Sequence, residues 1–310
     1  MGKYKFSGHE TFPLRFGWLP KGLRALNKDS DIFFNKNEAM VELGVGKNMV
    51  RAIRHWCSAL ELARVDGRKD LGEVEPLGEN LFLEPDPWDP YLEDPGTLWL
   101  LHWFLANRKE QASTWHLAFT EWNKEVFTKE QLVDWLHGIN EDMDTSRATR
   151  NSINRDVNVF LRTYVPSEPT AHRPLEDTFD SPFVELGLIR KEEDDLYKFM
   201  KGKKKSLPQE IFTFALIDFW EGLQEEQEEE SKSATLSFER VLYMAGSPGG
   251  AFQLSEDTLA ARLEKLPDEI GIEFDETSGL RNLLLTNNEL PNKIDILQDY
   301  YNRTEAEVAA

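Results

Sequence analysis

The side chains with the most reactive chemistry gather near the start of the chain, within residues 6–15. His9 can act as a general base near neutral pH, Glu10 can bind a metal ion, and Arg15 can hold a phosphate group. These three residue types within one short segment predict a polar catalytic site formed by His9, Glu10 and Arg15. The same residues also fit a buried hydrogen-bonding cluster that anchors the start of the chain, and both interpretations stay open.

A second group of useful side chains lies on a predicted helix over residues 47–61. One stripe of this helix is apolar at helical spacing, and the opposite stripe is polar and basic. The residues on that stripe that we predict to contact DNA are Lys47, Asn48, Arg51, Arg54 and His55. Arginine suits this role because it can grip a phosphate or a guanine edge with two hydrogen bonds. The alternative is that the arginines only solvate the outer face of the helix.

A third group lies on a predicted helix over residues 146–164. Its only acidic residue is Asp156, although the chain as a whole is acidic. The residues that we predict to contact DNA there are Arg147, Arg150, Asn151, Asn154 and Arg155. Arginine and asparagine are the types that bind phosphates and base edges, so this enrichment favours nucleic acid.

The elements around the first basic helix predict a winged helix–turn–helix. A helix over residues 37–43 comes first, and Gly44 and Gly46 then supply a tight turn. After the basic helix, residues 62–74 predict a strand, a turn at Asp66-Gly67 and a second strand, which is the pattern of a wing.

Similar units are expected further along the chain. Thr128 and Gln131 match a capping box at the start of a helix that precedes residues 146–164. In the last third, helices over 238–244 and 258–266 precede a hairpin over 270–274 and 279–285. The surface of that last unit is acidic, so we interpret it as a packing or partner domain.

These patterns predict a mainly α protein with small β-hairpin wings, in which several winged helix–turn–helix-like units are joined by helical segments. We expect an N-terminal winged-helix DNA-binding domain at 1–84 and a helical middle region with a second helix–turn–helix-like unit at 85–174. An acidic helical or winged-helix-like domain is expected at 175–310.

Charge is distributed unevenly along the 310 residues. The formal net charge is −20, which argues against indiscriminate coating of nucleic acid. Residues 1–70 nevertheless hold 13 Lys and Arg against 8 Asp and Glu. This basic segment would attract a phosphate backbone to one end of the protein. The alternative is that its charge complements that of an acidic domain of the same chain. A single cysteine, Cys57, and the lack of a long apolar run or a signal-peptide pattern predict a cytoplasmic protein without membrane association.

Standard catalytic signatures are mostly absent. Many restriction-type nucleases hold a metal ion with an acid, any residue, and then lysine. The only such triplet is Glu230-Ser231-Lys232, inside an acidic run. The sequence therefore shows no recognisable nuclease core.

Several motifs resemble those of a bacterial family known as domain of unknown function 4007. The opening motif is Lys5-Phe6-Ser7-Gly8-His9-Glu10-Thr11-Phe12-Pro13-Leu14-Arg15, followed by Trp18-Leu19-Pro20-Lys21-Gly22. Further matching stretches are Gly44-Val45-Gly46-Lys47-Asn48-Met49-Val50 and Ile53-Arg54-His55-Trp56. The resemblance covers most of the chain.

Members of this family are similar to SspB, a DNA-nicking component of DNA phosphorothioation systems that defend bacteria against phage. The resemblance implies a protein that binds double-stranded DNA, works with other phosphorothioation-system proteins, and nicks one strand before sulfur insertion. Mg²⁺ or Mn²⁺ would be the cofactor, with no ligand set assigned. The alternatives are a non-catalytic DNA-binding adaptor or scaffold and a winged-helix transcriptional regulator. The sequence does not indicate an oligomeric state.

Overall fold

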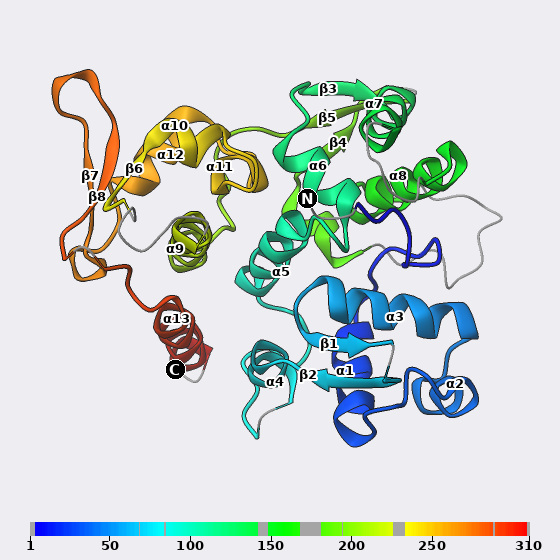
Figure 1. Cartoon of the computed structure of the whole chain (residues 1–310). Coiled ribbons are helices and arrows are strands. Elements are labelled where there is room, and N and C mark those ends of the chain that lie inside the picture. The colour runs from blue at the N-terminus through cyan, green and yellow to red at the C-terminus, as the bar shows by residue number, and fades with distance from the viewer. Residues whose placement is uncertain are drawn as a thin grey trace. The chain divides into compact units, whose positions relative to one another are not determined.

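The chain is a mixed α/β protein in which helices alternate with small antiparallel sheets (Figure 1). A computed structural model describes residues 4–67, 69–83, 85–141, 148–167, 181–193, 195–225, 233–287 and 289–308. Two compact units are present: unit 1 comprises Met1–Ala118 and Trp122–Met200, and unit 2 comprises Phe119–Glu121 and Lys201–Ala310. Unit 1 spans both of the first two predicted domains, and the division into three domains stays a prediction.

Unit 1 begins with three helices and a hairpin, in the order expected from the sequence. These elements are α1 (Trp18–Lys28), α2 (Lys36–Leu43), α3 (Lys47–Ala59), β1 (Ala63–Asp66) and β2 (Leu71–Val74). The turn between α2 and α3 is confirmed at Gly44, whose φ of 61° is a left-handed conformation that glycine adopts without steric cost. The two strands pair antiparallel, with Ala63 opposite Val74.

The apolar stripe of α3 faces α1 and forms the centre of this part of the core. Ile53, Trp56 and Cys57 are completely buried. A side chain at Gly22 of α1 would place its Cβ 2.6 Å from Ile53 Cγ2, which is shorter than any normal contact. Gly22 therefore permits the close approach of α1 to α3.

The rest of unit 1 is built around a second small sheet. Its elements are α4 (Pro76–Phe82), α5 (Pro95–Asn107), α6 (Ser113–Thr120), β3 (Val126–Thr128), α7 (Lys129–Glu141), α8 (Arg150–Tyr164), the 3₁₀ helix η2 (Pro182–Leu186), β4 (Ile189–Lys191) and β5 (Leu196–Phe199). The strand order is β3-β5-β4, with both pairs antiparallel. The capping box at the start of α7 is confirmed, because the Thr128 N–H donates to Gln131 Oε1 and the Gln131 N–H donates to Thr128 Oγ1.

Unit 2 repeats this strand order. Its elements are α9 (Gln209–Glu225), β6 (Thr235–Ser237), α10 (Phe238–Tyr243), α11 (Pro248–Ala251), α12 (Glu256–Leu263), η4 (Asp268–Ile270), β7 (Ile272–Asp275), η5 (Thr277–Gly279), β8 (Asn282–Leu285) and α13 (Lys293–Val308). The sheet order is β6-β8-β7. Ser237 caps α10 and Ser255 caps α12, each accepting a backbone N–H from three residues on.

The hairpin predicted over 270–274 and 279–285 is present as β7 paired with β8, but both three-stranded sheets also contain a strand that the sequence did not predict. In each, a short strand that precedes the helix pair joins the later hairpin: β3 pairs with β5, and β6 pairs with β8. Both leading strands have three residues, too few for an alternating pattern to stand out. No helix in the described ranges combines the length and apolar character needed to cross a bilayer.

Candidate nucleic-acid interface

The basic stripe of α3 is accessible along the first half of the helix. Lys47 and Asn48 are exposed and Arg51 is half-buried. The Arg51 Nη1–H donates to Glu10 Oε1 at 3.3 Å, so one carboxylate from the opening segment partly offsets this guanidinium. The ion pair is open to water, with the Arg51 side chain 38% exposed, so the charge of Arg51 remains available to a ligand.

Three cations converge on a pocket of about 400 Å³ beside α3. They are Lys5, Arg51 and Arg54, and Lys5 comes from the opening segment rather than from the helix. The remaining lining residues are Gly8, Phe34, His55, Ser58, Val65, Gly67, Glu110 and Gln111. A smaller neighbouring pocket shares Arg51 and Arg54 and adds Lys36 and Lys47. We call this continuous surface the basic face.

The cations of the basic face perturb one another. The pKa of Lys5 is lowered, first by burial and then by the charge of Arg54. The pKa of Arg54 is also lowered, by burial and by Arg51, while Glu10 acts in the opposite direction. Arg54 in addition lies over the ring of Phe34, 5.5 Å from its centroid. The positive charges of Lys5, Arg51 and Arg54 therefore lie close enough to influence one another.

His55 lies at the inner side of the pocket, away from the exposed stripe on which the sequence pattern put it. It is buried, and its pKa is well below the ordinary value, first because of burial and then because of its electrostatic neighbours His9, Lys5 and Arg54. Its Nε2 atom has no hydrogen-bond partner among the described residues. The helical periodicity missed this because the opening segment covers that side of α3: a Cβ on Gly8 would lie 2.6 Å from His55 Nδ1.

His9 is buried and both of its ring nitrogens are engaged. His9 Nε2 lies 2.5 Å from Asp156 Oδ1, and the Thr11 N–H donates to His9 Nδ1 at 3.2 Å. Since Nδ1 accepts, the hydrogen bonds assign the ring proton to Nε2, which donates to the carboxylate. Thr114 Oγ1 donates to Asp156 Oδ2, also at 2.5 Å. These are the contacts of an anchor, and His9 presents no lone pair to solvent.

The three residues predicted as catalytic do not converge on one open site. Glu10 is turned toward Arg51, whereas Arg15 lies over the rings of Phe12 and Trp18, at 5.5 and 5.4 Å from their centroids. The opening segment reaches this arrangement through unusual backbone angles. Positive φ values occur at Ser7, Gly8, Glu10 and Thr11.

The basic residues of α8 have different environments. Arg150 forms ion pairs with Asp134, at 2.7 Å, and with Glu130. Asn151 and Arg155 are exposed, Asn154 is half-buried, and Arg155 makes no ion pair within the described part of the chain. The helix begins at Arg150, after the cap at Thr149, which is four residues later than predicted. Arg147 and the triplet Glu230-Ser231-Lys232 lie outside the described residues.

Sequence reasoning missed Lys5 and Asp156. Lys5 stands in the opening motif, but only the fold brings it to α3. Asp156 carries a signal that was available: it lies three residues after Ile153 and four before Phe160, on the buried stripe of its helix. A lone acid on an apolar stripe needs a buried partner, and His9 is that partner.

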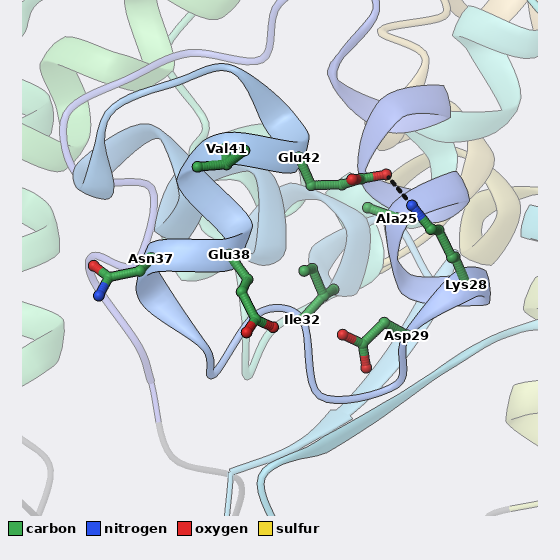
Figure 2. Close-up of a pocket in the computed structure, with 8 residues that line it drawn as sticks. All are labelled: Ala25, Lys28, Asp29, Ile32, Asn37, Glu38, Val41 and Glu42. Atoms are coloured by element: carbon green, nitrogen blue, oxygen red, sulfur yellow. Dashed lines mark hydrogen bonds and ion pairs between the residues drawn. The ribbon is translucent and has the colours of Figure 1, made fainter.

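A hollow between α1 and α2 carries acidic side chains, in contrast to the basic face (Figure 2). It encloses about 420 Å³ and is lined by the carboxylates of Asp29, Glu38 and Glu42, of which Glu42 accepts from Lys28 Nζ at 3.1 Å. Acids at this position repel a polyanion, so the hollow does not extend the basic face.

The described residues do not form an evident metal centre. Within them, no three His, Cys, Asp or Glu side chains gather as ligands would. The carboxylate of the opening motif, Glu10, is paired with Arg51, and the buried carboxylate of Asp156 is paired with His9. The donor set therefore does not fit a magnesium ion coordinated by a dedicated carboxylate cluster.

Comparison with known proteins identifies the family. The model of the family described as protein of unknown function DUF4007 matches residues 6–301. The chain belongs to the DUF4007 family. This DUF4007 protein is also similar to two solved structures, a crystal structure of SspB and a crystal structure of magnesium ion-bound SspB. In each case the sequence identity is 30%, the TM-score is 0.82, and the alignment covers 97% of this chain and 89% of the other. No curated protein matches the chain.

Proposed function

We propose that this DUF4007 protein is a DNA-binding component of a bacterial DNA phosphorothioation system and that its helix–sheet units are winged helices. The similarity to SspB over nearly the whole chain supports the assignment to that system. The order of three helices and a hairpin in α1, α2, α3, β1 and β2 supports a winged helix with α3 as its recognition helix. Other proteins of the phosphorothioation system are its proposed protein partners.

One observation carries the DNA-binding proposal: Lys5, Arg51 and Arg54 converge on one side of α3 in a protein of net charge −20. Positive charge concentrated on the exposed side of a helix orients a polyanion toward that helix even when the whole molecule is acidic. Lys47 and Asn48 then extend from the first turn of α3, where a recognition helix contacts base edges.

The test is duplex binding by fluorescence anisotropy at several salt concentrations. Replacing Arg51 and Arg54 together by Gln removes two charged hydrogen-bond donors, and each loss weakens binding about tenfold. The matched control is Arg64→Gln, because Arg64 is an exposed arginine of β1 that is paired with Glu73 at 2.6 Å. Duplex affinity that is the same in the double variant, the control and the wild type would overturn the proposal and leave a scaffold role.

Strand nicking with Mg²⁺ or Mn²⁺ is a second candidate function. One of the similar solved structures is magnesium-bound SspB, which favours it, and His9, Glu10 and Arg15 remain its proposed residues. The described side chains around them do not form a carboxylate cluster that could hold a metal ion, and this argues for DNA binding without cleavage. Incubating supercoiled plasmid with the protein and Mg²⁺ or Mn²⁺ separates the two: relaxed plasmid with the wild type and closed plasmid with Glu10→Gln supports nicking, and closed plasmid with both supports the adaptor.

A further inference from the structure

The pocket beside α3 has the composition of a site for one anionic group. Its walls come from separate parts of the fold: Lys5 and Gly8 from the opening segment, Arg54 and His55 from α3, and Gly67 from the β1–β2 turn. Five of its side chains carry charge or an ionisable ring, and the cations outnumber the acids. Segments far apart in the sequence have therefore been brought together around a shared positive potential.

The charges around the pocket match a monoanion. The cations are Lys5, Arg51 and Arg54, and the acids are Glu10, bonded to Arg51, and Glu110, which lines the pocket. The excess is one positive charge. A phosphodiester in a nucleic-acid backbone carries one negative charge, so a single backbone phosphate would neutralise the pocket.

Neutral hydrogen-bond donors complete the pocket. Ser58 Oγ donates to Gln111 Oε1 at 3.0 Å, so the amide oxygen of Gln111 is occupied and its NH₂ group remains a donor. His55 lies at the inner wall, and its buried Nε2 lacks a partner among the described residues. The imidazole ring of His55 therefore closes the inner wall of the pocket, and the Gln111 amide supplies a neutral donor.

The absence of a side chain at Gly8 keeps the pocket open. With φ at +120°, Gly8 adopts a conformation that residues with a side chain rarely take, and an added Cβ would lie 2.6 Å from His55 Nδ1. The opening segment is held at this place by the Lys5 N–H, which donates to Ser113 Oγ at 2.7 Å.

We infer that the pocket formed by Lys5, Gly8, Arg51, Arg54 and His55 binds one phosphodiester group of the DNA backbone, and that the opening motif exists to build its wall. This inference rests on the proposed function and gives it a definite contact. A helix in the major groove has a phosphodiester strand on each side, and the pocket lies on the flank of α3 that faces the β1–β2 turn. Besides burial, Arg54 lowers the pKa of Lys5 and Arg51 lowers the pKa of Arg54, and a bound anion would offset these cationic contributions.

Inorganic phosphate is the first probe, read out as thermal stabilisation. The wild type should gain about 3 °C in Tm at a phosphate concentration of roughly ten times Kd. Lys5→Gln should lose most of that gain, because it removes a lining charge without touching the core. The matched control is Arg24→Gln, an exposed cation of α1 outside the pocket, which should keep the full gain. An equal gain in Lys5→Gln and the wild type would overturn the inference.

The salt dependence of duplex binding is the second readout. Removing one phosphate contact with Lys5→Gln should lower the slope of log K against log salt concentration by about 0.9. Binding with an unchanged slope and an unchanged phosphate response overturns the pocket and leaves DNA binding intact. A phosphate response without any duplex binding retains the pocket and overturns the proposed function.

Discussion

His9 and Asp156 are joined by a buried contact of 2.5 Å although 147 residues separate them in the chain. The contact attaches the opening motif to α8, and Thr114 extends it to α6 through the second carboxylate oxygen. It also fixes the position of Glu10, which follows His9 directly and bonds to Arg51. The geometry of the basic face therefore depends on an interaction between the opening segment and α8.

Asp156→Ala should destabilise the protein strongly. It leaves the His9 N–H and the Thr114 hydroxyl buried without an acceptor, and such a change costs about 3 kcal/mol in the free energy of unfolding. Urea denaturation followed by tryptophan fluorescence measures it. The control is Asp134→Ala, since Asp134 is 62% exposed in its pair with Arg150 and its loss costs less than about 1 kcal/mol. Equal losses in both variants would show that the buried contact is not an anchor.

His55 should make stability depend on pH in the acidic range. Its pKa lies well below the ordinary 6.5 in the folded protein, so the unfolded chain takes up a proton below pH 6.5 that the folded protein does not. Stability contributed by neutral His55 is therefore complete above pH 6.5 and falls by up to about 1.4 kcal/mol per unit as the pH decreases below it. His55→Gln should show a shallower decline in urea denaturation series between about pH 7.5 and 5.5. Parallel declines in the two proteins would contradict the assignment.

The two arginines of α8 should contribute unequally to DNA binding. Arg150 is already paired with Glu130 and Asp134, whereas Arg155 is exposed and has no ion pair with a described residue. Arg155→Gln should weaken duplex binding about tenfold, and Arg150→Gln should have a smaller effect, because a phosphate would have to compete with two carboxylates. Anisotropy titrations at one salt concentration decide the order. The reverse order would exclude α8 as a DNA-contacting helix in this orientation.

Cys57 should be chemically inert in the folded protein. It is completely buried, and burial raises the pKa of its thiol to about 12, so almost no thiolate exists near neutral pH. A thiol reagent at about pH 8 should modify the protein only after addition of denaturant. Modification at a rate independent of denaturant would show that the α1–α3 interface opens readily.

Local patterns predicted the local structure well. The apolar stripe of α3, the turn at Gly44 and the capping box of Thr128 with Gln131 all follow from spacing within a few residues, and each is confirmed. Helix periodicity predicts burial best where one face of a helix packs against one neighbouring helix, as the face of α3 that carries Ile53 packs against α1.

Contacts between distant segments were not predictable in the same way. His9 met the description of both a general base and a buried anchor, and only the position of Asp156 distinguishes them. His55 has polar neighbours along the helix, and its burial depends on a segment that crosses α3 from far away in the sequence. The pairing of β3 with β5 joins strands of three and four residues that are nearly 70 residues apart, so no periodic signal could reveal it.

The strand order β6-β8-β7 has a consequence for synthesis on the ribosome. The central strand, β8, is the last of its sheet to be made, and within the described chain β6 and β7 each pair only with it. Until residue 285 has left the exit tunnel, two strands wait with unpaired backbone groups, as they do in unit 1 until β5 emerges. A nascent chain of this protein therefore passes through two intervals in which chaperones have exposed β-edges to protect.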